Sequence, residues 1–240
     1  MLKSLNLTFG NRMRFGNLAI ITARGGSKRI PRKNIKEFFG KPMLFYAINA
    51  AFESGIFDEI MVSTDDDEIA QIARNLGAKV PFMRSAKTAD DFATTADVLK
   101  EVVSKYQEMG FEIGQICCIY PCVPFLSGDL LKKAHEKLIN SNAHALTPVV
   151  RYSFPIQRAF VVDKDGFLQF REPQNASKRS QDLEPTYHDA GAFYFFKFSD
   201  LRSDKKIAYE IDEIFAQDID TIDDWKMAEM KYEIMQKGLK

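Results

Sequence analysis

A glycine loop rich in cations is the segment of this 240-residue chain best suited to chemistry. The loop follows an apolar run, contains Gly25 and Gly26, and carries the basic residues Arg24, Lys28, Arg29, Arg32, Lys33, Lys36 and Lys41. Paired glycines let backbone N–H groups approach an anion, and the cations can neutralise several phosphate charges. The loop therefore predicts a polyphosphate ligand, with a solvated basic surface loop as the alternative.

The order of residues in this loop excludes two common nucleotide motifs. The chain lacks a Gly-Lys-Ser/Thr sequence, and it also lacks Gly-x-Gly-x-x-Gly. Neither an ordinary P-loop NTPase nor a dinucleotide enzyme is therefore indicated.

An acidic segment near the end of the chain could supply the counterpart to the loop. Residues 207–225 contain seven acids and no base: Glu210, Asp212, Glu213, Asp218, Asp220, Asp223 and Asp224. In an extended segment Asp218 and Asp220 lie on the same side. Two such carboxylates suit Mg²⁺, which shares its remaining positions with phosphate and water. Solvated loop acids are the alternative for an isolated Asp-x-Asp pair.

Composition narrows the class of protein. The 33 Lys and Arg residues balance 33 Asp and Glu residues, so we expect neither nucleic acid nor a membrane surface as a partner. The three clustered cysteines, Cys117, Cys118 and Cys122, fit neither a secreted disulfide framework nor a zinc site. This favours a reduced, cytoplasmic setting. No apolar run approaches the ~18 residues that a membrane span needs.

Alternating strands and helices must position these groups. Apolar runs predict strands over 18–23, 59–63, 79–83, 115–120 and 143–150. Helical patterns occupy 42–55, 65–76, 94–109 and 129–139. The alternation predicts an α/β fold with a doubly wound, mostly parallel sheet, which binds ligands at the carboxyl ends of its strands.

The second half of the chain departs from this alternation. A β-hairpin is expected over 161–170, a returning strand over 192–198 and a last helix from Thr221. The expected organisation is an N-terminal arm over 1–16 and one domain over 17–240, with a β-rich insertion or flap over about 151–190.

The glycine loop resembles the nucleotide-binding motif of the CMP-sialic acid synthetase family, cytidylyltransferases that activate nine-carbon acidic sugars. The family pattern A-R-x-x-S-K-x-x-x-x-K-N is matched at Ala23, Arg24, Ser27, Lys28, Lys33 and Asn34. The resemblance runs from about Leu18 to Lys237 and implies a Rossmann-like nucleotidyltransferase fold. Enzymes that activate the eight-carbon sugar Kdo lack the Lys-Asn ending and match less well.

This resemblance implies roles for both charged segments. Arg24, Lys28 and Lys33 would hold the CTP triphosphate, and the implied nucleotide site comprises Ala23, Arg24, Gly25, Gly26, Ser27, Lys28, Lys33, Asn34 and Thr94. An Asp-Ile-Asp-Thr motif in the family implies Asp218 and Asp220 as Mg²⁺ ligands, and Arg24, Lys33 and Asp220 are the implied catalytic groups. Thr94 can alternatively be interpreted as a helix cap. Asp65 either belongs to the first turn of a helix or forms part of the floor of the nucleotide site.

The acidic sugar needs cations for its carboxylate and fixed polar groups for its hydroxyls and amides. The candidate residues are Tyr120, Lys178, Arg179, Gln181, Asp182, Tyr187, His188 and Phe193. Around these residues the chain resembles the pseudaminic acid cytidylyltransferases of flagellated bacteria, whereas sialic acid synthetases tend to have Gln at the position of Tyr120. Pseudaminic acid lacks the 9-hydroxyl, so Tyr120, Phe125 and Phe193 are expected to line an apolar part of the pocket.

The implied reaction is attack of the sugar's anomeric 2-hydroxyl on the α-phosphorus of CTP, giving a CMP-sugar for glycosylation of surface structures such as flagellin, and pyrophosphate. Sialic or legionaminic acid is the alternative substrate, and a nucleotide-binding regulatory protein is the alternative outside enzymes. The insertion resembles the segment that swaps between subunits in this family, which implies a homodimer.

Overall fold

A computed structural model describes residues 13–90, 92–197 and 201–238 of the chain. Within these residues a seven-stranded sheet consists of β1 (Met13–Thr22), β4 (Glu59–Ser63), β5 (Phe111–Ile119), β6 (Ala145–Arg151), β9 (Tyr187–Asp189), β10 (Phe193–Phe196) and β11 (Lys206–Glu210). The strand order is β11-β6-β10-β5-β1-β4, and β9 pairs with the end of β6.

Most strands of this sheet run parallel. β1 pairs in parallel with β4 and β5, and β6 pairs in parallel with β11. β10 runs antiparallel between β5 and β6, and β9 is antiparallel to β6. The predicted α/β fold with a mostly parallel sheet is confirmed.

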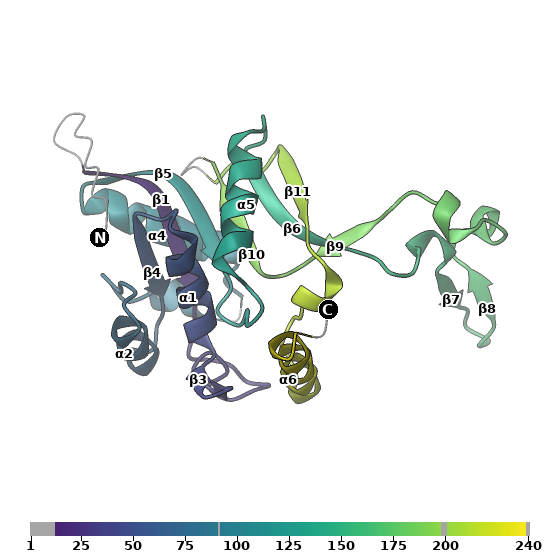
Figure 1. Cartoon of the computed structure of the whole chain (residues 1–240), viewed down its shortest axis with the longest axis horizontal. Coiled ribbons are helices and arrows are strands. Elements are labelled where there is room, and N and C mark those ends of the chain that lie inside the picture. Colours follow the sequence, from purple (N-terminus) through teal and green to yellow (C-terminus); the bar gives the residue numbers. More distant parts are fainter. Residues whose placement is uncertain (1–12, 91, 198–200, 239–240) are drawn as a thin grey trace.

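Helices cover both faces of the sheet (Figure 1). The α-helices of the described residues are α1 (Leu44–Ser54), α2 (Asp67–Asn75), α3 (Ala86–Ala89), α4 (Thr95–Glu108), α5 (Gly128–Ile139) and α6 (Ile222–Gln236), of which α6 lies apart from the sheet. Side chains alternate along β1, so Ala19 and Ile21 join the core that contains α1 and α5, whereas Leu18 and Ile20 join the core beneath α4. All four are fully buried, which explains why this strand is a continuous apolar run.

A third apolar cluster packs the glycine loop against the last helix. Ile30 of the loop, Ile219 of the acidic segment and Trp225 of α6 are all buried in it. After the loop the chain forms the short strands β2 (Glu37–Phe38) and β3 (Lys41–Pro42). The two oppositely charged segments therefore meet because each buries an apolar residue beside its charged ones.

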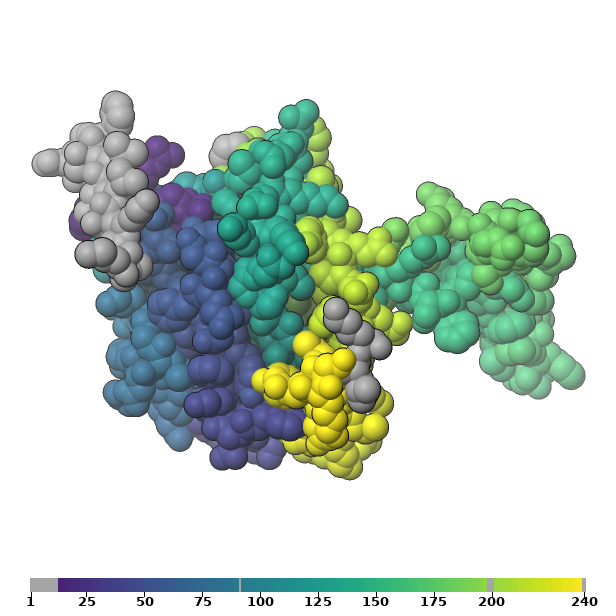
Figure 2. Space-filling view, viewed as in Figure 1, coloured from purple at the N-terminus to yellow at the C-terminus, as the bar shows by residue number. Residues whose placement is uncertain are grey.

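Residues 152–186 project from the sheet as an arm (Figure 1), which stands clear of the rest of the molecule in Figure 2. The arm carries the antiparallel pair β7 (Phe160–Val162) and β8 (Leu168–Phe170), so the hairpin expected here is present. It also contains 3₁₀ turns at Ile156–Arg158, Pro173–Asn175 and Ser180–Asp182.

Several local predictions need correction. Residues 1–12 of the expected arm lie outside the described residues, but 13–16 belong to β1 because they pair with β5. The strand predicted over 79–83 is reduced to one bridge between Met61 and Lys79, since Pro81 cannot continue the ladder. β11 was not predicted, because only alternate residues of it are partly buried. Among the described helices, none is long and apolar enough to cross a bilayer.

Candidate active site

A pocket of about 430 Å³ opens at the carboxyl ends of β1 and β5. The glycine loop lines one side of it with Arg24, Ser27, Lys28, Arg29, Lys33 and Asn34. Asp218 and Asp220 also line it, and Tyr120 follows β5 into the wall. The fold thus brings the basic and the acidic segment to one cavity, where a ligand of a parallel sheet is expected.

Buried hydrogen bonds hold the base of the loop. The backbone N–H of Ala23 donates to the Ser63 carbonyl at 3.0 Å, which continues the pairing of β1 with β4. The Asn34 side chain is nearly buried; its Nδ2 donates to the Arg24 carbonyl at 2.9 Å, and its Oδ1 accepts from the Cys122 thiol at 3.3 Å. Asn34 therefore ties the end of the loop to its beginning, which fixes the position of Arg24.

The acids at the start of α2 shape the glycine loop. The backbone N–H of Gly25 donates to Asp65 Oδ1 at 3.1 Å, and Arg32 hydrogen-bonds to Asp66 and Glu68. Asp66 also caps α2 by accepting from the backbone N–H of Ile69. The hydrogen bond from Arg32 is the main cause of the lowered pKa of Asp66. A side chain at Gly25 would collide with Asp66, since a Cβ there would lie 2.7 Å from Oδ2.

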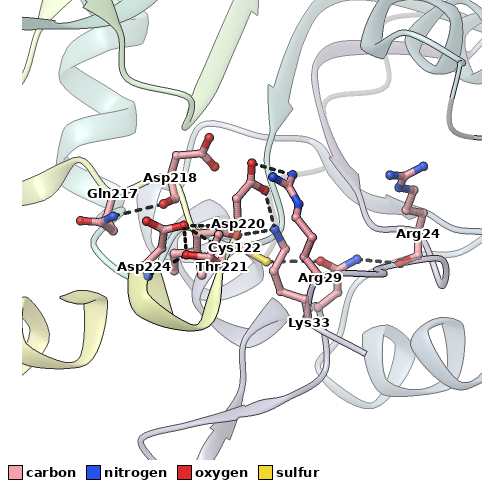
Figure 3. Close-up of polar contacts among 11 residues, drawn as sticks. Arg24, Arg29, Lys33, Cys122, Gln217, Asp218, Asp220, Thr221 and Asp224 are labelled. Carbon is pink, nitrogen blue, oxygen red and sulfur yellow. Dashed lines mark hydrogen bonds and ion pairs between the residues drawn. The ribbon is translucent and has the colours of Figure 1, made fainter. Parts of the chain in front are cut away.

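The Asp220 carboxylate lies between two cations of the loop (Figure 3). Its Oδ1 is 3.3 Å from Lys33 Nζ, and its Oδ2 is 2.7 Å from Arg29 NH2. Lys33 also donates to the Ile219 carbonyl, while Asp224 Oδ2 accepts from the backbone N–H of Asp220 at 3.1 Å. These contacts hold the acidic segment against the loop.

Asp218 and Asp220 could hold a divalent cation. Burial raises the pKa of Asp218, and the neighbouring Asp220 carboxylate raises it further. This excess of negative charge is what a bound cation would relieve, and carboxylate oxygens are ligands that Mg²⁺ accepts. Within the described residues, no group of three or more His, Cys, Asp or Glu is arranged to hold a metal. Phosphate and water would therefore have to complete the coordination.

Three of the predicted site residues have other structural roles. Thr94 forms a capping box with Asp97 at the start of α4, and its neighbour Thr95 lines the pocket instead. Ala23 is fully buried in the core. Phe193 is also fully buried; it lines a small apolar cavity together with Phe125, and neither residue lines the larger pocket.

The remaining sugar candidates lie on the arm or at its base. The arm carries Lys178, Arg179, Gln181 and Asp182, and β9 carries Tyr187 and His188. Arg179 pairs with Asp182 at 2.7 Å, and the His188 ring lies 5.0 Å from that of Tyr152. The arm projects from the sheet (Figure 1), and none of these groups lines the pocket of its own chain, whereas Tyr120 does.

Arg84 is a pocket residue that the sequence analysis missed. Its side chain is buried, donates to Ser63 through Nε at 3.0 Å, and has a pKa lowered by burial. Its position in the sequence could have identified it: Arg84 directly follows the apolar run 79–83, and residues that follow such runs meet at the ligand-binding edge of the sheet.

The cysteines have a packing role. Cys117 and Cys118 are fully buried on β5, and all three thiols are free. Burial raises the pKa of Cys118 and of Cys122 to about 12, so both stay protonated at neutral pH.

Comparison with known proteins consistently identifies cytidylyltransferases and CMP-sugar synthases as similar proteins. A family model described as cytidylyltransferase matches residues 18–237. The pseudaminic acid cytidylyltransferase of Campylobacter jejuni is 40% identical over 91% of this chain and 97% of that protein. The CMP-N,N'-diacetyllegionaminic acid synthase of Legionella pneumophila is 30% identical over 92% of this chain and 98% of that protein. N-acylneuraminate cytidylyltransferase A of Danio rerio is 35% identical over 89% of this chain and 50% of that protein.

A solved structure supports the fold. The CMP:2-keto-3-deoxy-manno-octonic acid synthetase complexed with CTP superimposes with a TM-score of 0.67 over 92% of this chain and 99% of that chain. The two sequences are 18% identical, so the likeness concerns the fold alone.

Proposed function

The chain belongs to the cytidylyltransferase family, and we propose that it transfers CMP from CTP to pseudaminic acid, releasing pyrophosphate. Membership of this family makes the protein a nucleotidyltransferase, so the alternative of a regulatory nucleotide-binding protein falls away. The observation that carries the proposal is the pocket itself, where the basic loop and the acidic segment meet through Lys33 and Asp220.

In the proposed reaction the anomeric 2-hydroxyl attacks the α-phosphorus and loses its proton, while the bond to the β-phosphate breaks. Arg24, Lys28 and Lys33 face the pocket, where they would stabilise the charge that develops on the triphosphate. Asp218 and Asp220 would hold Mg²⁺, which supplies Lewis-acid polarisation of phosphate oxygens when bound. Asn34 and Asp65 hydrogen-bond to the backbone at the start of the loop, so that part of the backbone needs little reorganisation on binding.

Pseudaminic acid is the proposed acceptor because the relative that is 40% identical bears that name. Tyr120 lines the pocket; its ring lies 5.4 Å from that of Tyr194, and its hydroxyl lies 3.3 Å from Thr95 Oγ1. Legionaminic and sialic acids remain the competing acceptors, since relatives 30% and 35% identical are named for them.

The arm supports a homodimer. Its apolar side chains are unusually exposed, with Phe154 at 84%, Phe167 at 69% and Val162 at 66%. Apolar surface of this kind marks a protein interface. In the proposed dimer, the arm of each subunit covers the pocket of its partner and brings Lys178 and Arg179 to the sugar carboxylate.

The same proposal includes the cellular setting. The free, protonated thiols suit the reducing cytoplasm, where CTP is made. The CMP-sugar would then serve the glycosylation of surface structures such as flagellin.

The nucleotide half of the proposal is tested with purified protein, pseudaminic acid and each nucleoside triphosphate in turn. We expect pyrophosphate release with CTP and Mg²⁺, and its loss when EDTA removes the metal. Equal release with UTP, or full activity in EDTA, would refute the assignment of CTP or of the metal.

A further inference from the structure

Both oxygens of the Asp220 carboxylate already contact cations of the glycine loop. Oδ2 pairs with Arg29 at 2.7 Å, and Oδ1 pairs with Lys33 at 3.3 Å. Asp220 is also one of the two carboxylates proposed above to hold Mg²⁺. A divalent cation that approaches Asp220 is therefore repelled by two positive charges, and this repulsion falls if one of them moves away.

The two cations differ in how firmly they are held. The Lys33 side chain is 19% exposed, and it has a second partner in the Ile219 carbonyl. The Arg29 side chain is 66% exposed and reaches across from the loop to Asp220, as Figure 3 shows. Exposed ion pairs contribute little net stability, so Arg29 can leave at low cost while Lys33 remains.

The other arginines of the loop have different partners. Arg32 turns away from the pocket to Asp66 and Glu68, and Arg24 donates through NH1 to the Asp90 carbonyl at 3.2 Å. Arg29 of the loop pairs directly with the acidic segment.

We infer that Arg29 acts as a latch: it keeps Asp220 from binding a divalent cation until the triphosphate of CTP draws the guanidinium away. This inference rests on the proposed function. A guanidinium is always charged, and its planar fork fits phosphate as well as carboxylate. The triphosphate carries more negative charge than one carboxylate, so it is the stronger partner for Arg29. The metal then enters together with the nucleotide, and binding is ordered.

The latch predicts opposite changes in the affinities for free metal and for CTP. Mn²⁺ is used as the metal, so that the two affinities can be measured separately. In Arg29→Gln we expect Mn²⁺ alone to bind about two- to fivefold tighter than in the wild type, as measured by electron paramagnetic resonance, because an exposed ion pair is weak. The same variant should bind CTP without metal more weakly in calorimetry, because a phosphate partner is lost. Arg29→Lys, which keeps the charge, should retain weak binding of free Mn²⁺.

The matched control is Lys226→Gln. Lys226 is also 66% exposed and pairs with Asp223 at 3.3 Å, so this change removes a nearby charge without touching Asp220. We expect both affinities to stay at the wild-type level. An unchanged Mn²⁺ affinity in Arg29→Gln, or an equal gain in Lys226→Gln, would overturn the latch.

Failure of the latch can be told apart from failure of the proposed function. If only the latch is wrong, Mn²⁺ affinity does not respond to Arg29, while pyrophosphate release still depends on CTP and metal. If the metal assignment is wrong, Asp220→Ala leaves Mn²⁺ binding unchanged in the presence of CTP, and the latch falls with it.

Discussion

The ammonium of Lys33 and the carboxylate of Asp220 lie 3.3 Å apart, although 187 positions separate them in the chain. This contact joins the loop after the first strand to the segment before the last helix. The net charge of zero in the composition conceals this local concentration of charge, in which cations of the loop and carboxylates of the acidic segment line one pocket.

Lys33→Ala is expected to weaken CTP binding by about tenfold or more, because hydrogen bonds to charged groups are worth roughly 1.5–3 kcal/mol. The measurement is the dissociation constant of CTP by calorimetry. Lys36→Ala is the matched control, since the Lys36 ammonium lies 5.4 Å above the Trp225 ring instead of facing the pocket. An unchanged constant in Lys33→Ala would count against its phosphate role.

Asp220→Ala is expected to lower kcat by about 100-fold or more, because it removes a proposed ligand of the metal that would stabilise charge in the transition state. The fold should persist, since the capping box of Thr221 and Asp224 does not use the Asp220 side chain. Initial rates of pyrophosphate release measure the effect. Asp223→Ala, which removes an exposed carboxylate one turn away, should retain the wild-type rate. Wild-type activity in Asp220→Ala would contradict the assignment of Asp220 as a metal ligand.

The pair of Arg32 and Asp66 predicts a pH-dependent stability. Arg32 lowers the pKa of Asp66, so the pair stabilises the fold above the ordinary range of aspartate and loses this effect as the pH falls through the lowered pKa. Asp66→Asn keeps the helix cap and should cost up to about 1 kcal/mol of unfolding free energy at neutral pH, given that Arg32 is partly exposed.

This cost should shrink between neutral and acid pH, because the Asp66 carboxyl becomes protonated in the folded protein as the pH falls through its lowered pKa. Asp66→Ala also removes the cap, and should therefore lose about 1 kcal/mol more, with part of that loss persisting in acid. Urea unfolding at the two pH values measures both variants. Equal losses for Asp66→Asn at neutral and acid pH would contradict the ion-pair account.

Charges placed on the arm should separate the proposed dimer. The double variant Val162→Lys, Phe167→Lys replaces two exposed apolar side chains of the hairpin, and light scattering should report a monomer. CTP should still bind, because the basic loop lies within one chain, whereas sugar turnover should fall. Met230→Lys, at a residue 60% exposed on α6, is the control. The proposed dimer would be contradicted if the wild-type protein is a monomer, or if the double variant is still a dimer.

The parts of the fold set by local pattern could be predicted from the sequence. The apolar run at β1, the glycines that follow it and the cap at Thr221 each depend on neighbouring residues, and the structure contains all three. β11 could not be predicted, because its partner β6 lies far away in the sequence and only alternate residues are partly buried.

The site was less predictable, because several side chains have two possible roles and tertiary contacts determine which role each one takes. Thr94 could cap a helix or approach a nucleotide, and Asp97 three residues later completes the capping box. Asp65 reaches the backbone of Gly25 only because β4 lies beside β1. The link between Asn34 and Cys122 depends equally on the packing of distant segments.

The most direct test of the account is the relative kcat/KM of the purified protein for three acceptors, measured as pyrophosphate release with CTP and Mg²⁺. Pseudaminic, legionaminic and N-acetylneuraminic acid are compared under the same conditions, and mass spectrometry identifies the CMP-sugar. We predict the highest value for pseudaminic acid, with one pyrophosphate formed for each CMP-pseudaminic acid. Preference for either of the other acids, or no release with any of them, would contradict the account.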